Sequence, residues 1–479
     1  MNSIKTLLIV SIIAILAVLS SCNNESIKSN KAVIKLDFKV SDNIKPIIKS
    51  TSPFQLNADT LTADANGKFI FNIKIKSPAY YNISFEGFRQ SFTIYIRPGD
   101  SVIVNAQDIS SIANTLTFNG NAPVYNDYIY EAELISRQAS QSLMNLFKYD
   151  ETRAMFSIDS IRAIHADNIA SLQKGNANID PFFLKIEKAR AIYEWAKLHK
   201  LYPLYYNYIN KLDDENGVKL SPEYDTYLAE VNLNDDELIT LPAYIDFLKI
   251  YLQADYNLYY NDDELETKYG SYANYQLYSY NEKVESKEIK SILSYSSIMD
   301  QVNYQGKKEK DTYWTLFESL CTNEILKSNI NVELSKWAHL DKGQATEEIE
   351  MNDIEGNKVH FSDFKGKWIY IDIWATWCSP CVKEIPTLKN LEKQFHGQNI
   401  VFMSISVDKT AKPWLEMVKD KELKGIQVWA GQNETINTFY KVNGIPRFMI
   451  FDPQGNIYDA NAIRPSMGMD KVIEELLKK

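Results

Sequence analysis

The sequence predicts several domains: a β-sandwich near the N-terminus, an all-α middle domain and a C-terminal α/β domain. The length of 479 residues exceeds the usual size of one domain. Apolar and polar residues alternate within residues 33–118, which is typical of strands with one buried face. Residues 121–340 carry apolar residues at helical spacing, whereas residues 345–479 contain both patterns. We therefore expect domains with these boundaries.

Residues 1–22 have the pattern of a signal peptide. Lys5 precedes an apolar run that ends in Leu19-Ser-Ser-Cys22, and the run is shorter than the about 20 residues that span a bilayer. The ending resembles a bacterial lipobox, which implies a lipid on Cys22; the alternative is an ordinary secretory signal with a chance cysteine. Both predict a protein in the cell envelope outside the cytoplasm, on the periplasmic face or the outer surface, with residues 23–32 as a polar tether.

The β-sandwich is expected from about six short strands. Ile34, Leu36 and Phe38 alternate with charged residues, and Asn66-Gly67 is a strong hairpin signal. Residues 33–118 contain no evident nucleophile, metal-ligand cluster or glycine-rich loop, so we expect a scaffold.

Helix-start signals recur in the middle domain. Asp180-Pro181 predicts an N-cap followed by proline in the first turn. The sequence Asn-Asp-Asp-Glu-Leu occurs at 234–238 and 261–265, and we interpret both as helix starts. Their spacing departs from that of a calcium loop, which makes metal binding the weaker alternative.

Tyrosine is concentrated in the same region, with 24 of the 30 tyrosines between residues 121 and 320. A ring with a polar tip is typical of helix–helix seams and of binding surfaces. We expect core and seam positions, with a docking surface for a peptide or a glycan as the alternative.

Charge and cysteine content exclude some classes of protein. The net charge of −10 is divided into +4 for residues 1–120, −12 for 121–344 and −2 for 345–479, which argues against a nucleic-acid partner. Of four cysteines, Cys321 lies in an apolar helical pattern and is expected to be a buried, inert thiol. The alternative is a redox partner for the Cys378–Cys381 pair.

That pair lies where a strand gives way to a helix. Residues 368–374 are apolar and rich in aromatic and β-branched side chains, as expected of a buried strand. After Cys381 the apolar residues recur every three or four positions. Cys378 is thus predicted at a helix N-terminus, where unpaired N–H groups and the helix dipole favour a thiolate.

The stretch Trp374-Ala-Thr-Trp-Cys-Ser-Pro-Cys381 resembles the active site of the thioredoxin superfamily, and most closely its TlpA/ResA branch of membrane-tethered thiol-disulfide oxidoreductases. Glu384 and Gly444-Ile445-Pro446 match further positions of that branch. The resemblance implies a thioredoxin-like fold for residues 345–479. It also implies no cofactor and no metal beyond the redox-active disulfide Cys378–Cys381.

The resemblance assigns roles to individual residues. Cys378 is the exposed nucleophile, the more buried Cys381 resolves the mixed disulfide, and Asp372 and Glu384 take its proton. The alternatives are an Asp372 that acts only through its charge and a solvent-facing Glu384. The other site residues are Ser379 and Pro380 between the cysteines, Trp377 as a shelter for the sulfurs, and Ile445 and the cis-proline Pro446 for substrate binding. Arg447 stands where many relatives have a small polar residue, so substrate docking is expected to differ.

Function follows from the same resemblance. We expect reduction of oxidised protein thiols by a lipid-anchored enzyme that a membrane electron donor keeps reduced; apocytochrome c is one substrate class of the group. One alternative is a surface lipoprotein that binds peptide or glycan and has an accessory thioredoxin domain. The other is a peroxidase, which a Cys-x-x-Cys pair after tryptophan disfavours.

Overall fold

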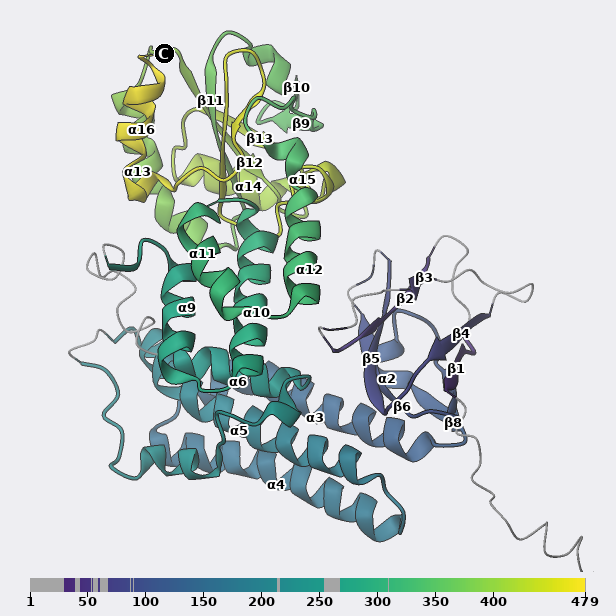
Figure 1. Cartoon of the computed structure of the whole chain (residues 1–479). Helices are drawn as coiled ribbons and strands as arrows, with labels where there is room; N and C mark the ends of the chain where they lie inside the picture. The colour runs from purple at the N-terminus through teal and green to yellow at the C-terminus, as the bar shows by residue number, and fades with distance from the viewer. Residues whose placement is uncertain are drawn as a thin grey trace, which may run out of the picture. The chain divides into compact units, whose positions relative to one another are not determined.

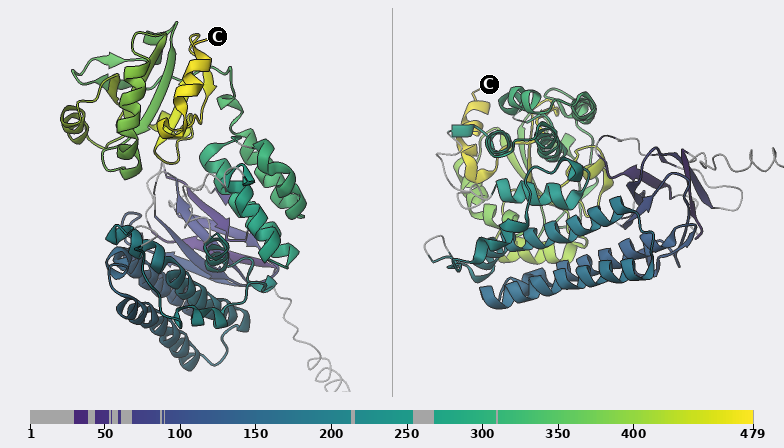
Figure 2. Two further views of the ribbon diagram at one scale, coloured as in Figure 1. Left: turned by 90° about the vertical axis from the view of Figure 1, so that its left-hand side faces the viewer. Right: turned by 60° about the horizontal axis from the view of Figure 1, so that its bottom comes forward.

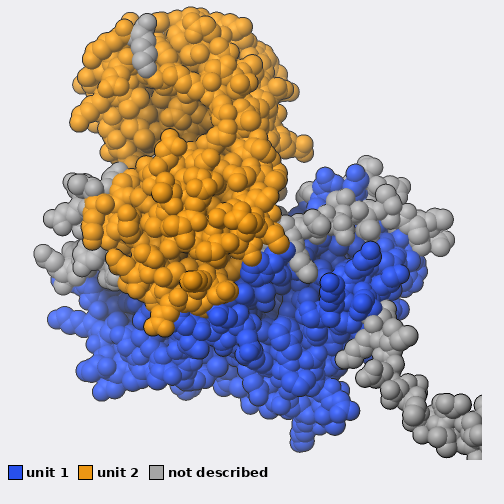
Figure 3. Space-filling model, in the orientation of Figure 1, with its two compact units in different colours: residues 1–260 blue, residues 261–479 orange. Residues whose placement is uncertain are grey.

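The chain divides into two compact units, residues 1–260 and 261–479 (Figure 3). The computed structural model describes residues 30–38, 44–52, 54, 59–60, 68–86, 88, 90–212, 216–253, 268–308 and 310–478. The signal peptide with Cys22, the Asn66-Gly67 hairpin and the motif at 261–265 lie outside the described residues. The division at 260 falls inside the region 121–340 that we predicted as one helical domain.

Two four-stranded sheets begin the first unit (Figure 1). The first has the order β4 (Phe69–Lys74), β1 (Lys31–Leu36), β7 (Ser101–Asn105), β8 (Thr117–Gly120). The second has the order β3 (Asp59–Thr60), β2 (Pro46–Ser50), β5 (Ala79–Phe85), β6 (Ser91–Ile96). Ile34 and Val104 of the first sheet and Ile83 and Ile94 of the second belong to one hydrophobic core. The strand-rich N-terminal region is therefore confirmed, and its detailed description as a sandwich stays a prediction.

Helices follow these sheets in the first unit. They are α2 (Ile112–Thr115), α3 (Pro123–Leu146), α4 (Glu151–Gly175), α5 (Pro181–Asn210), η1 (Tyr224–Glu230), η2 (Asp236–Leu238) and α6 (Pro242–Leu252). The predicted cap of α5 is confirmed, because the Asp180 carboxylate accepts the N–H of Phe182. The predicted helix start at Asn234 is wrong in detail. Asp235 is the cap, and it begins only a three-residue 3-10 helix.

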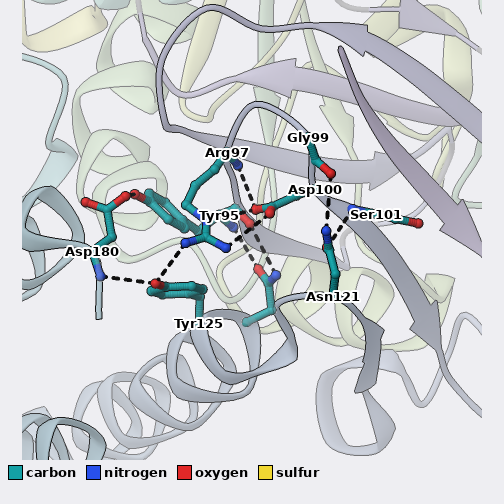
Figure 4. A network of polar contacts seen from close by, with 9 residues as sticks. Tyr95, Arg97, Gly99, Asp100, Ser101, Asn121, Tyr125 and Asp180 are labelled. Atoms are coloured by element: carbon teal, nitrogen blue, oxygen red, sulfur yellow. Dashed lines mark hydrogen bonds and ion pairs between the residues drawn. The ribbon is translucent and has the colours of Figure 1, made fainter. Parts of the chain in front are cut away.

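A polar network joins the sheets to the helices within this unit (Figure 4). The Tyr95 hydroxyl donates to Asp180 over 3.0 Å, and Arg97 Nη1 donates to the Tyr125 hydroxyl over 3.1 Å. The carboxylate of buried Asp100 accepts from Arg97. At the centre, Asn126 is fully buried and bridges the backbone of Tyr95 on β6 to α3. Such a bridge stabilises the junction because it satisfies buried backbone groups.

Asn126→Ala should lower the free energy of unfolding by about 2–4 kcal/mol, because it leaves the N–H and C=O of Tyr95 unpaired in a buried site. Asn121 offers a matched control, since it makes the same kind of bridge to Ser101 N–H and Gly99 C=O but is exposed. Asn121→Ala should cost less than about 1 kcal/mol, because water replaces its contacts. Urea unfolding of the full chain measures both, and equal losses would contradict the assigned role of Asn126.

The buried tyrosines of the helical region occupy the positions we predicted for core and seam residues. Tyr202, Tyr244, Tyr280 and Tyr313 are completely buried. Tyr193 and Tyr244 make an edge-to-face contact at 4.8 Å between α5 and α6. The alternative, a docking surface, is not tested by these contacts.

Among the described residues of the second unit, four successive helices precede the sheet: α9 (Tyr272–Lys283), α10 (Lys287–Gln305), α11 (Lys310–Leu320) and α12 (Glu324–Ser335). They are followed by η3 (Ala338–Leu340), and α10 contacts each of the other three (Figure 1). Cys321 follows α11 as a buried free thiol, and burial raises its pKa to about 11. It is therefore a poor nucleophile, as we predicted.

A seven-stranded sheet completes the second unit (Figures 1 and 2). Its order is β10 (Lys358–Val359), β9 (Met351–Asp353), β13 (Ile426–Trp429), β12 (Ile400–Ser406), β11 (Trp368–Trp374), β14 (Arg447–Phe451), β15 (Ile457–Asp459). The remaining elements are η4 (Phe361–Phe364), α13 (Ser379–Gln394), α14 (Ala411–Asp420), α15 (Glu434–Thr438), η5 (Pro465–Met467) and α16 (Met469–Leu476). Central β11 is buried throughout, as its apolar sequence predicted; it runs parallel to β12 and antiparallel to β14. The expected strand followed by a helix around the cysteines is confirmed.

Candidate active site

Cys378 and Cys381 form a disulfide at the junction of β11 and α13. Cys378 is the N-cap of α13, and its sulfur accepts the N–H of Cys381 over 3.2 Å. Ser379 and Pro380 between them are exposed. The first turn of a helix has free N–H groups and a positive dipole end, so this position favours a thiolate once the disulfide is reduced.

The structure corrects one prediction about the cysteines. We expected an exposed Cys378 and a more buried Cys381, but in the disulfide the two residues are 4% and 3% exposed. Both belong to an apolar cluster with Trp374, Ile385 and other side chains. Packing around the disulfide therefore buries the two residues alike, which local sequence spacing could not reveal.

The cis-proline loop lies against the same cluster. The Ile445–Pro446 peptide is cis, and Ile445 packs on the cluster that contains both cysteines. Trp377, directly before Cys378, is 71% exposed, so its indole lies at the surface and its expected role as a shelter stays a prediction. Trp374 is fully buried in the core, as expected.

Asp408 holds the backbone before the cysteines and was missed from the sequence. It is 3% exposed, and its carboxylate accepts the N–H and the hydroxyl of Thr376, the latter over 2.8 Å. The hydroxyl of Ser406 at the end of β12 also donates to it over 2.9 Å. Because β12 is parallel to β11, the ends of these strands meet at one edge of the sheet. The sequence signal that could have identified Asp408 is its position as an acidic residue just after a buried strand.

Two predicted carboxylates are buried near each other. Asp372 on β11 is 7% exposed and Glu384 on α13 is 8% exposed, so the alternative of a solvent-facing Glu384 is wrong. The Glu384 carboxylate accepts the N–H of Ser466 over 3.1 Å and its hydroxyl over 2.8 Å. Ser466 is 82 residues away in sequence, and no local signal pointed to it.

Burial raises the pKa of Asp372 to about 8, and the charges of Glu384 and Glu392 raise it in the same direction. Burial also raises the pKa of Glu392, to about 7. Oδ1 of Asp372 has no hydrogen-bond partner among the described residues. No hydrogen bond to this atom from these residues therefore compensates for the desolvation of the ionised carboxylate. A group with such a pKa exchanges protons readily near neutral pH.

Arg447, directly after Pro446, is buried and contacts the helical part of its own unit. Its guanidinium donates to the backbone oxygens of Tyr304, Lys441 and Ala460 and to the side chain of Asn461. Burial lowers its pKa to about 10. The guanidinium therefore makes these hydrogen bonds within its own unit. The expected effect of Arg447 on substrate docking stays a prediction.

The fold and the disulfide at a helix N-terminus beside a cis-proline define a dithiol oxidoreductase module of the thioredoxin-like class. A sequence model of the AhpC/TSA family matches residues 342–460. Thiol-disulfide oxidoreductase ResA of Bacillus cereus is 29% identical over 145 residues, which are 30% of this chain and 82% of the relative. Residues 342–460 thus match an AhpC/TSA thioredoxin-like domain, and this part of the chain is similar to thiol-disulfide oxidoreductases.

Solved structures include relatives with higher identity. A crystal structure described as a thiol-disulfide oxidoreductase of Bacteroides vulgatus is 40% identical; it covers 29% of this chain and 99% of its own, with a TM-score of 0.28. A solution structure with the same description is 44% identical and covers 29% of this chain and 91% of its own, with a TM-score of 0.26.

Two further features of the described residues bear on the site. No group of three or more His, Cys, Asp and Glu side chains there could hold a metal ion. In the same part of the chain, no helix combines the length and apolar character needed to cross a bilayer.

Asp372→Asn should remove a pH dependence of stability. The folded oxidised protein keeps Asp372 protonated up to about pH 8, whereas an unfolded aspartate ionises near about pH 4. Folding therefore binds a proton between these values, and the free energy of unfolding falls as pH rises, by at most about 1.4 kcal/mol per pH unit. The melting temperature of the asparagine variant minus that of the native protein should grow by several degrees between pH 5 and pH 8.

The exposed Asp311 on α11 provides the control. Asp311→Asn should leave the difference in melting temperature flat over the same range. A flat difference for Asp372→Asn would show that its pKa is not raised in the folded protein.

Proposed function

We propose that this chain is a lipid-anchored, extracytoplasmic enzyme that reduces protein disulfides through Cys378 and Cys381. The observation that supports the proposal is the disulfide at the N-terminus of α13 beside the Ile445–Pro446 loop. Two cysteines three residues apart already form the bond that the reaction must break and remake.

The first step is attack on the substrate. In the reduced enzyme, the Cys378 thiolate attacks one sulfur of the substrate disulfide. That disulfide breaks, a mixed disulfide forms between Cys378 and the substrate, and the other substrate sulfur leaves as a thiolate. The N–H of Cys381, which donates to the Cys378 sulfur, stabilises the negative charge before attack.

The second step releases the substrate. Cys381 loses its proton and attacks the Cys378 sulfur, which forms the disulfide and frees the second substrate thiolate. Two electrons thereby pass from the enzyme dithiol to the substrate. Asp372 accepts the proton, because its pKa of about 8 lies close to that of a thiol. Burial is the main cause of that raised pKa, and the charge of Glu384, which Ser466 holds in place, adds to it.

Cys381→Ser should halt the reaction after the first step. Without the resolving thiol, the mixed disulfide on Cys378 should persist, and turnover should fall by at least about 100-fold because Cys378 alone cannot close the cycle. Non-reducing electrophoresis and mass spectrometry detect the complexes and name the partners. Cys378→Ser is the control and should capture nothing; capture that survives this substitution would contradict the assignment of the nucleophile.

The direction of the reaction is testable through the reduction potential. A disulfide reductase should have a potential below about −200 mV, closer to the about −270 mV of thioredoxin than to the about −120 mV of the oxidant DsbA. Equilibration of the full chain in thiol–disulfide buffers, followed by alkylation and mass measurement, gives the value. A potential near about −120 mV would reverse the proposed direction to oxidation.

The proposed anchor is a lipid on Cys22, supported by the sequence Leu19-Ser-Ser-Cys22 after an apolar run. The enzyme would then act at a membrane surface and receive electrons from a donor in that membrane. The trapped complexes test the anchor. They should fractionate with membranes, and Cys22→Ser should move them to the soluble extracytoplasmic fraction; unchanged fractionation would rule out anchoring through Cys22.

A further inference from the structure

The last turn of α10 is hydrogen-bonded to the segments around the cis-proline loop. Asn443 donates to the carbonyl oxygen of residue 303 over 2.7 Å, Arg447 donates to that of Tyr304, and Asn461 donates to that of Gln305 over 2.9 Å. The final carbonyls of a helix have no partner within the helix. Three consecutive carbonyls of α10 therefore obtain partners from the thioredoxin-like domain, and one partner is a cation at the negative end of the helix dipole.

These contacts place the ring of Tyr304 on the loop. A Cβ atom built on Gly444 would lie 3.0 Å from Cε1 of Tyr304, so the ring rests on the backbone of this glycine. Tyr304 is nevertheless 54% exposed. One edge of the ring therefore contacts the loop, while the exposed part of the residue is available for contact with a bound polypeptide.

The ring contacts the loop that borders the redox centre. Gly444 precedes Ile445, and Ile445 packs on the cluster that contains Cys378 and Cys381. A polypeptide that runs along the backbone of residues 444–446 while its disulfide reaches Cys378 would lie beside Tyr304. A small disulfide that reaches the same sulfur would not extend to the ring.

We propose that Tyr304 is a specificity-determining residue whose ring contacts the polypeptide that flanks the substrate disulfide. The preferred substrate is then a disulfide carried by an extended peptide segment, rather than a small-molecule disulfide. This inference rests on the proposed function, since it concerns the substrate of the same two cysteines. An aromatic ring with a polar tip is well suited to peptide contact, because it offers apolar area and a hydrogen-bonding group together.

The test compares two oxidants of the reduced full chain carrying Cys22→Ser. One is 2-hydroxyethyl disulfide, and the other is the symmetric disulfide of an eight-residue peptide with leucine beside its cysteine. Alkylation quench and mass measurement give a second-order rate constant for each. Tyr304→Ala should lower the rate constant for the peptide about fivefold, the size expected of one aromatic contact, and leave that for the small disulfide unchanged.

Two variants serve as controls. Tyr304→Phe keeps the ring and should keep the preference for the peptide within about twofold. Tyr278 on α9 is 40% exposed in the same unit, and Tyr278→Ala should change neither rate constant. The melting temperature of each variant shows that it is folded.

The remaining outcomes separate this inference from the proposed function. If Tyr304→Ala lowers both rate constants equally, or neither, the ring only packs on the loop and the inference is wrong. If the native dithiol reacts with neither disulfide, the proposed function itself fails, and the specificity role fails with it.

Discussion

The position of Cys378 as the N-cap of α13 is the constraint on which the redox site depends. It places the sulfur against the N–H of Cys381 and at the positive end of a 16-residue helix. The strand before it fixes this position, because β11 is buried along its whole length. Asp408 then holds the connecting backbone at Thr376. A thiolate at the end of a rigid strand needs little rearrangement to react.

Burial is the largest cause of the raised pKa values of the carboxylates around this centre. The pKa of Asp372 is raised mainly because its charge would be desolvated, and Glu384 and Glu392 add repulsion. Glu384 differs from Asp372, since both of its oxygens accept hydrogen bonds from Ser466. The site therefore keeps one carboxyl ready to exchange a proton beside another that is anchored.

The second unit joins the redox domain to helices that the family resemblance does not cover. Arg447 illustrates the connection: it occupies the position after the cis-proline, yet it donates to the end of α10. Burial lowers its pKa to about 10, and backbone carbonyls accept its hydrogen bonds. The helical elements thus contribute directly to the surroundings of the loop, through Tyr304. Substrate choice and redox chemistry can consequently be set by different parts of one unit.

Local spacing in the sequence was enough to predict the strand of residues 368–374, the helix after Cys381 and the cap at Asp180. These features depend on neighbours a few residues apart, and both the backbone periods and the capping contacts act over that range. The resemblance also indicated which two cysteines form the disulfide.

Tertiary structure alone decided which distant side chains complete the site. Asp408 reaches Thr376 across 32 residues, Ser466 reaches Glu384 across 82, and Arg447 reaches Tyr304 across 143. It also decided that Cys378 is buried in the disulfide, against our prediction. Contacts over such separations depend on how whole elements pack. Hydrophobic burial drives that packing and is non-directional, so the apolar pattern of one element does not show which distant element it will contact.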